Sequence, residues 1–140
     1  MGRIISLDVG DKRIGVAVCD PTRMLVTPLL TIQRKNMQTD VKRIAALVAE
    51  QEAELVVVGL PMNMDGTEGE QARKARSLAK QLAFATRRPI EFQDERLSTF
   101  SAIEGLVERG VKTGHNRDLV DMEAAAIILR AFLDNRRESR

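Results

Sequence analysis

The chain opens with two short apolar runs that are separated by a polar turn. Residues 4–9 and 14–18 are rich in Ile, Val and Leu, and Gly10 and Asp11 lie between them, which favours a β-hairpin. Strand alternation divides the first run into two faces, one with Ile5, Leu7 and Val9 and the other with Ile4, Ser6 and Asp8. Asp8 therefore ends a row that is otherwise suited to burial. It either caps the turn by accepting backbone N–H bonds or faces a cation or a phosphate.

The remaining pattern predicts three more strands and four helices. Strands are expected at residues 24–32, where Pro28 favours a sheet edge, at 55–60, an apolar run typical of a buried parallel strand, and at 90–93. Helices are expected from Thr39–Asp40, from Glu70 to about Ala85, from Ser98 or Ser101 to Gly110, and from Asp118 to about Asp134.

The order β-β-β-α-β-α-β-α-α predicts an α/β fold with a five-stranded mixed sheet. Three strands are antiparallel neighbours, right-handed crossovers join the others, and helices cover both faces. Nothing in the sequence indicates a second domain. We therefore expect one domain over residues 1–134, followed by a frayed basic tail at 135–140.

Composition narrows the class of protein. The chain has 140 residues, 44% of them hydrophobic, and its longest apolar run is far shorter than the ~20 residues that span a bilayer. Cys19, expected to be a small buried residue, is the only cysteine, and no secretory signal is visible, so we expect no membrane contact and a cytoplasmic location. The basic residues are 16 Arg and 6 Lys, which favours phosphate contacts, while the four Phe offer little for base stacking.

Three carboxylates are expected to converge at one edge of the sheet. If the first strand is central, Asp8 and the pair Asp94–Glu95 follow the carboxyl ends of parallel strands, and the long loop 61–69 lies at the same edge. Asp121 lies on the core-facing side of the first turn of the last helix, although an aspartate there can simply favour the helix dipole. Either Asp94 or Glu95 could be the second acid.

Crowded carboxylates repel one another unless a cation neutralises them. Oxygen ligands alone select Mg²⁺ or Mn²⁺, which can activate a water for phosphodiester hydrolysis. The candidates for contact with nucleic-acid phosphates are Lys12, Arg13, Arg96, Thr99, Lys112 and Arg117. His115 is either a solvated loop residue or a group for proton transfer or product release.

Four motifs together resemble one family. They are Asp8-Val9-Gly10 with Arg13-Ile14-Gly15-Val16-Ala17, Val58-Gly59-Leu60-Pro61 with Asp65-Gly66-Thr67, Asp94-Glu95-Arg96-Leu97-Ser98-Thr99, and Val120-Asp121 with Ala124-Ala125. The chain is similar to the YqgF family, also called RuvX, of Holliday-junction-resolvase-like proteins and pre-16S ribosomal RNA nucleases. The resemblance implies a ribonuclease-H-like fold, a cytoplasmic role in maturing the 5′ end of 16S ribosomal RNA, and an acidic site of Asp8, Glu95 and Asp121.

Two departures separate this chain from resolvases of that superfamily. Resolvases place their second carboxylate after the fourth strand, where this chain has Gly59-Leu60-Pro61, so Glu95 must replace it from the neighbouring strand. They also carry a second acid three residues after the one on the last helix, where this chain has Ala124. The site therefore has one ligand fewer for a second metal ion.

The leading hypothesis is a metal-dependent endonuclease that acts on structured RNA, with Asp8, Glu95 and Asp121 as catalytic groups and metal ligands. The alternatives are a non-cleaving nucleic-acid-binding module in transcription or ribosome assembly, and a resolvase of branched DNA. Asp8-Val9-Gly10 also resembles the phosphate-contacting turn of actin-like kinases, but a single lobe of this size cannot close on ATP. A monomer or weak homodimer is expected, and a strict monomer would favour RNA because a junction resolvase needs two sites.

Overall fold

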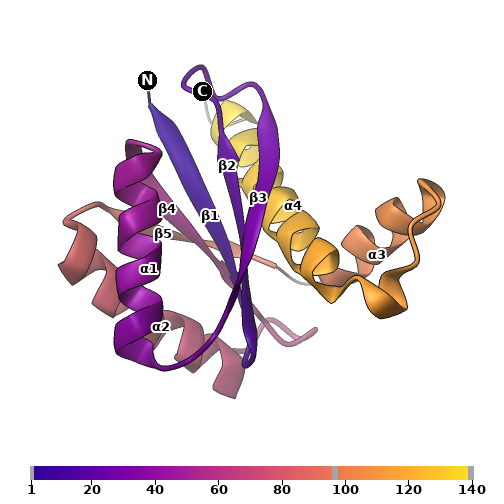
Figure 1. The fold of residues 1–140 in the computed structure, drawn as a ribbon, viewed down its shortest axis with the longest axis horizontal. Helices are drawn as coiled ribbons and strands as arrows, with labels where there is room; N and C mark the ends of the chain where they lie inside the picture. Colours follow the sequence, from indigo (N-terminus) through magenta and orange to yellow (C-terminus); the bar gives the residue numbers. More distant parts are fainter. Residues whose placement is uncertain (1, 96–97, 139–140) are drawn as a thin grey trace.

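The computed structural model describes residues 2–95 and 98–138, and Figure 1 shows their path. The strands are β1 (Arg3–Val9), β2 (Arg13–Cys19), β3 (Val26–Gln33), β4 (Ala53–Leu60) and β5 (Ile90–Asp94). The helices are α1 (Met37–Glu50), α2 (Glu70–Thr86), α3 (Ser98–Glu108), the short 3₁₀ helix η1 (Thr113–His115) and α4 (Arg117–Glu138). In the part of the chain that is described, no helix is both long and apolar enough to cross a membrane.

The five strands form one mixed sheet in the order β3-β2-β1-β4-β5. β2 is antiparallel to β1 and to β3, whereas β4 and β5 run parallel to β1. β1 is therefore central, and the carboxyl ends of β1, β4 and β5 lie at the same edge, which confirms the expected α/β fold. Pro28 lies on β3 at the edge of the sheet, where a missing N–H does not break an inner ladder.

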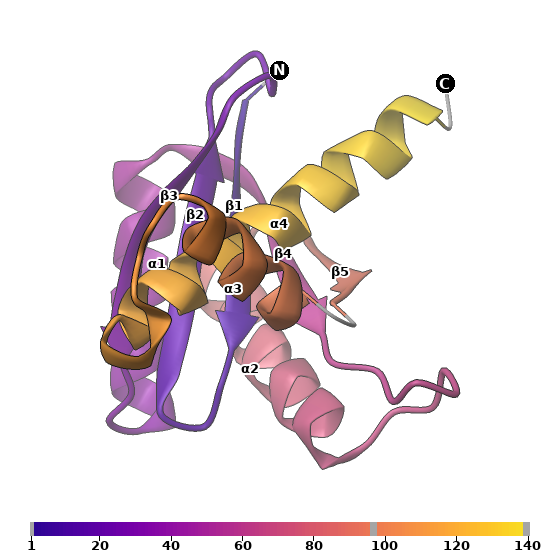
Figure 2. The same ribbon diagram turned by 90° about the vertical axis from the view of Figure 1, so that its right-hand side faces the viewer.

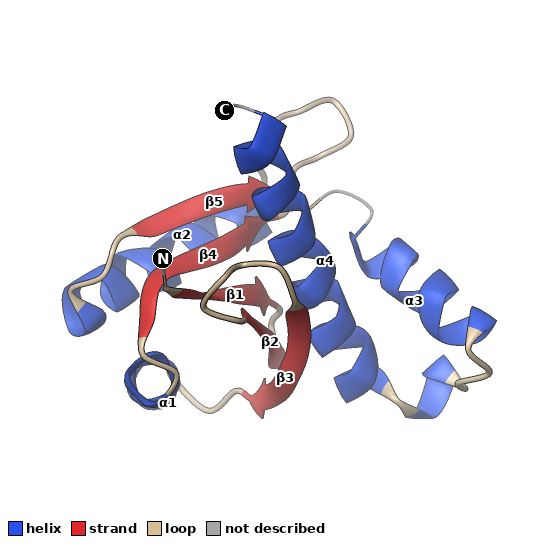
Figure 3. Cartoon of the chain, turned by 90° about the horizontal axis from the view of Figure 1, so that it is seen from above, coloured by secondary structure: helices blue, strands red, loops and turns tan. Residues whose placement is uncertain are grey.

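Helices cover both faces of the sheet. α1 and α2 pack on one face, α4 crosses the other, and α3 packs against α4 on the side away from the sheet (Figures 1, 2 and 3). The larger core lies under α1 and α2 and includes Ile5, Leu7 and Val9. Ile4 lies on the opposite face in a second cluster with Ile128 and Leu129 of α4. The alternation expected along β1 is thus observed.

Two predicted boundaries are corrected by local hydrogen bonds. β3 begins at Val26 instead of residue 24, because the Asp20 carboxylate accepts hydrogen bonds from the backbone N–H groups of Met24 and Leu25, both at 2.8 Å, and holds them in the turn. α1 begins at Met37 instead of Thr39, because the Asn36 side chain caps it by accepting from the Thr39 N–H at 2.8 Å.

The expected frayed tail from residue 135 is also corrected, since α4 continues to Glu138. The Arg136 guanidinium lies 4.8 Å from the centre of the Phe132 ring and pairs with Glu91 of β5. Arg137 donates a hydrogen bond to the carbonyl oxygen of Arg23 at 2.8 Å. These contacts tie the last turns of α4 to the sheet.

Candidate active site

Asp8 and Asp121 are brought together by a glycine between them. In the β1–β2 ladder Asp8 pairs with Gly15, and the backbone of Asp121 lies directly over that glycine. A Cβ atom at Gly15 would lie 2.0 Å from the Asp121 carbonyl oxygen, so only glycine allows α4 to approach this closely. The buried Ser6 hydroxyl donates to the carbonyl oxygen of Ala125 at 2.7 Å and fixes the helix one turn further on. The first turn of α4 is thereby held beside the end of β1.

Glu95 reaches the same place by crossing β4. It follows β5 directly, and its backbone N–H donates to the Leu60 carbonyl oxygen at 3.1 Å, which continues the β4–β5 pairing. Its side chain passes over Gly59, where a Cβ atom would lie 2.7 Å from Glu95 Oε2. The glycine on β4 therefore leaves the room through which the carboxyl group reaches Asp8. Asp94, in contrast, is exposed.

A hydrogen bond joins the side chain of Glu95, just after β5, to that of Asp8 on β1. Burial, the charge of Asp8 and the hydrogen bond to Asp8 together raise the pKa of Glu95 to about 10. Burial also raises the pKa of Asp8, against the hydrogen bond from Glu95, and the Asp121 charge adds to the rise. Near neutral pH the Glu95 carboxyl group thus stays protonated and donates a hydrogen bond to Asp8. Because Asp8 pairs with a carboxyl group that is distant in the sequence, a role in a functional site is favoured over simple capping of the β1–β2 turn.

Asp121 has a different partner. Arg13 Nε donates a hydrogen bond to Asp121 Oδ2 at 2.5 Å, and both side chains are partly buried. One proton and one guanidinium therefore offset charge among the three carboxylates. The Asp121 charge nevertheless acts on Asp8, which places all three groups in one neighbourhood.

The donor chemistry fits a hard divalent cation, although no cage is preassembled. Among the described residues, no group of three or more His, Cys, Asp or Glu side chains is arranged to hold a metal ion. Glu95 Oε2, however, is buried without a hydrogen-bond partner, which is costly for a carboxyl oxygen. Asp8 and Glu95 are already in contact, and Asp121 is held by Arg13. Three carboxylates could gather around Mg²⁺ or Mn²⁺ if Asp121 exchanged Arg13 for the ion.

Three of the predicted phosphate contacts lie beside Asp121. Lys12, Arg13 and Arg117 line a hollow of about 460 Å³ together with Gly10, Asp11 and Asp121. A second hollow, of about 320 Å³, is lined by Arg13, Arg117 and Asp121 with the loop before α4. Positive side chains thus border the acidic group, as a site for phosphodiesters requires.

The other predicted contacts are either not described by the structure or lie apart from this hollow. Arg96 lies outside the described residues, as does the side chain of Thr99. Lys112 and His115 are exposed on the loop before α4, and His115 lines a separate hollow with Arg117 but without Asp121. Their roles stay predictions.

Sequence reasoning missed the residues that hold the β1–β2 turn. Asp40 is fully buried and accepts from Arg34 Nε at 3.0 Å, while Arg34 Nη1 donates to the Gly10 carbonyl oxygen at 3.0 Å. On the outer side of the turn, Asp11 accepts hydrogen bonds from Gln71 and Lys74 of α2. The periodicity of α1 could have shown that Asp40 adjoins the buried stripe of Val41 and Ile44, but not its partner.

The chain matches known proteins by family model and by sequence. A family model described as "RuvX: Holliday junction resolvase" matches residues 2–135. Similar sequences include one from Crocosphaera subtropica, 48% identical over 135 residues and covering 96% of this chain and 94% of the relative. Another from an Anaeromyxobacter species is 46% identical over 134 residues, with 96% and 98% covered. Both relatives are named "Putative pre-16S rRNA nuclease".

Solved structures share the fold at low sequence identity. RuvC of T. thermophilus in complex with a Holliday junction substrate superposes with a TM-score of 0.62 at 15% identity and 96% coverage of both chains. The Fowlpox virus resolvase with Holliday junction DNA gives a TM-score of 0.61 at 11% identity, covering 95% of this chain and 97% of the other. Both likenesses support the expected ribonuclease-H-like fold.

Proposed function

The chain belongs to the RuvX family, and from this premise we propose that it is a metal-dependent endonuclease that processes the 5′ end of pre-16S ribosomal RNA. The observation that carries the proposal is the gathering of Asp8, Glu95 and Asp121, remote in sequence, at one edge of the sheet. The names of the relatives supply the substrate.

In this proposal Asp8, Glu95 and Asp121 would hold Mg²⁺ or Mn²⁺. The ion, when bound, supplies an activated water and stabilises charge on the leaving oxygen. Glu95 must first lose the proton that it shares with Asp8, because a protonated carboxyl group is a poor ligand. Arg13 must release Asp121, and its guanidinium then becomes available to a phosphate in the adjoining hollow.

Lys12 and Arg117 have the complementary task of orienting the substrate. Both line the hollow that contains Asp121, so a phosphodiester held there lies next to the acidic groups. Arg34 and Asp40 act indirectly, because they fix the turn that carries Lys12 and Arg13. The carboxylates, the basic residues and the turn thus form one surface for a phosphodiester.

The test is cleavage of an RNA that carries the 5′ region of precursor 16S RNA, with and without Mn²⁺. We expect Asp8→Asn and Asp121→Asn each to lower the rate at least about 100-fold, as loss of a group stabilising developing charge does. Asp94→Asn, a neighbouring carboxylate that is exposed, is the matched control and should retain activity. If Asp8→Asn cleaves as fast as the unaltered protein, the nuclease site is wrong. If the unaltered protein binds the RNA but does not cleave it in Mn²⁺, and binding survives loss of all three acids, a non-catalytic binding module is favoured.

A second candidate function is resolution of branched DNA, which the description of the family favours. Cutting a four-way junction requires two sites that act on two strands. A chain that sediments as a strict monomer and cleaves the RNA but not a junction would exclude this alternative. A dimer that cuts the junction in paired positions would support it.

A further inference from the structure

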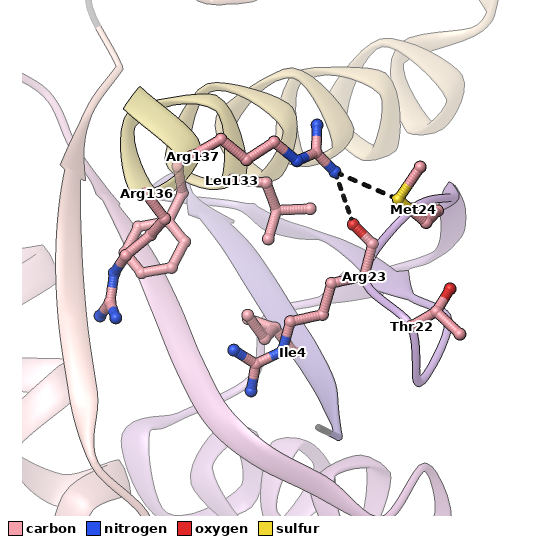
Figure 4. A pocket seen from close by; sticks show the side chains of 8 residues that line it. Ile4, Thr22, Arg23, Met24, Leu133, Arg136 and Arg137 are labelled. Carbon is pink, nitrogen blue, oxygen red and sulfur yellow. Dashed lines mark hydrogen bonds between the residues drawn. The ribbon is translucent and has the colours of Figure 1, made fainter. Parts of the chain in front are cut away.

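A pocket of about 150 Å³ lies at the end of the sheet opposite the three carboxylates (Figure 4). It forms where the start of β1, the turn between β2 and β3 and the last turns of α4 meet. Its apolar lining residues include Ile4, Phe132 and Leu133. Three arginines, Arg23, Arg136 and Arg137, also line it (Figure 4). No acidic residue is among those that line it in the described chain.

The arginine side chains are held both by neighbouring groups and by one another (Figure 4). Arg23 Nε donates to the Gly2 carbonyl oxygen at 2.9 Å, and its Nη2 lies 3.4 Å from Glu54 Oε2. Arg137 donates through Nη2 to the carbonyl oxygen of Arg23, and its Nη1 lies 3.3 Å from Asp134. These bonds use only some of the five N–H groups that each guanidinium carries. Arg136 pairs with Glu91, so each of the three arginines also contacts a carboxylate, and a phosphate in the pocket would use the donors that these pairs leave over.

The turn that carries Arg23 has a defined backbone conformation. Arg23 has a φ of 61°, in the left-handed region that a side chain other than glycine rarely adopts. The Asp20 carboxylate holds the turn through the N–H groups of Met24 and Leu25. Met24, which also lines the pocket, is 69% exposed, so an apolar side chain lies beside the arginines at the surface.

The size of the pocket limits what can occupy it. Sites for whole small-molecule ligands measure about 300–1,000 Å³, well above the volume here. The space suits one anionic group of a larger molecule that lies on the surface. Arginine forks match the oxygens of a phosphate, and the apolar lining keeps competing water away.

From these features we propose that the pocket is a second phosphate-binding site, which holds a backbone phosphate of the RNA far from the point of cleavage. The inference rests on the proposed function, since it assumes that the acidic edge binds RNA. Asp121 and Arg136 lie on the same helix, 15 residues apart, which corresponds to about 22 Å along its axis. An A-form RNA duplex rises about 2.8 Å per base pair, so this distance is the length of a duplex of about 8 base pairs.

Arg130 extends the basic surface toward the acidic end. It is exposed on α4 and lies seven residues before Arg137, so the two side chains leave the same side of the helix. RNA that contacts the pocket therefore has a further cation along its path. The pocket would select substrates long enough to reach it.

The test measures binding of two RNA hairpins that differ in length. The short hairpin has about 5 base pairs and the long one about 20, and only the long one can reach both sites. Binding is followed by fluorescence anisotropy in EDTA over a series of salt concentrations. The variant is Arg136→Gln with Arg137→Gln, and the control is Arg73→Gln with Arg88→Gln, which removes the same charge from exposed positions in and just after α2.

We expect the double variant to bind the long hairpin at least about 10-fold more weakly than the control and to lower the salt slope by about 1 to 2, one for each lost phosphate contact. Its affinity for the short hairpin should equal that of the control, which also shows that the variant is folded. Equal affinity and equal salt slope for the long hairpin would overturn the inference. An unaltered protein that binds neither RNA would instead refute the proposed function, so the two failures are distinguishable.

Discussion

The shared proton of Asp8 and Glu95 makes stability depend on pH, and Glu95→Gln tests it. Because the folded-state pKa of Glu95 is about 10 and its ordinary value is 4.5, the folded protein binds one more proton than the unfolded chain between these two values. Stability therefore falls as the pH rises through this window. Above about pH 10 both states have lost the proton, and the full cost of the buried charge is reached.

The magnitude follows from the size of the window. A difference of one bound proton between the folded and unfolded states changes the free energy of unfolding by about 1.36 kcal/mol for each pH unit. Between pH 6 and pH 8 the free energy of unfolding should therefore fall by up to about 2.7 kcal/mol. Glutamine at position 95 has no proton to lose, and its amide can still donate to Asp8. We therefore expect Glu95→Gln to be the more stable protein at pH 8 and to show a flatter dependence on pH.

The assay is urea unfolding followed by circular dichroism at pH 6 and pH 8, with EDTA present throughout. Glu104→Gln is the matched control, because Glu104 is exposed on α3. It should keep the pH dependence of the unaltered protein. If Glu95→Gln loses as much stability between pH 6 and pH 8 as the unaltered protein does, Glu95 does not carry the proton and the description of the site is wrong.

The remaining predictions concern the residues that support the site. Gly15→Ala should push α4 away from β2 and lower the free energy of unfolding by about 1 to 3 kcal/mol, with a larger proportional loss of cleavage, measured by urea unfolding and RNA cleavage. Asp40→Asn should cost about 3 kcal/mol by removing the buried negative charge that offsets Arg34, seen as a lower unfolding midpoint, and a change below 1 kcal/mol would contradict it. Arg117→Gln should raise KM for RNA more than it lowers kcat, since it orients phosphate. His115→Ala should change the pH–rate profile only if this exposed residue transfers a proton, and an unchanged profile would exclude that role.

The elements and their order were readable from the sequence because each depends on local pattern. The apolar runs of β1 and β4 and the helical stripe that includes Val41 and Ile44 are periodic signals that hold for any arrangement of the chain. Boundaries failed where a side chain made a contact that no period reveals. The hydrogen bond from Met24 to Asp20 places the start of β3 later than predicted. The contacts of Arg136 with Phe132 and Glu91 accompany an α4 that is longer than predicted.

The candidate site divides in the same way. The sequence by itself determined that Asp8 ends a buried strand and that carboxyl groups follow the parallel strands, since strand direction sets which ends meet. Only the tertiary structure decided that Glu95 crosses β4 over Gly59 while Asp94 is exposed, and that Arg13 holds Asp121. These outcomes depend on the space between elements that are distant in the chain, and packing of that kind leaves no local pattern to read.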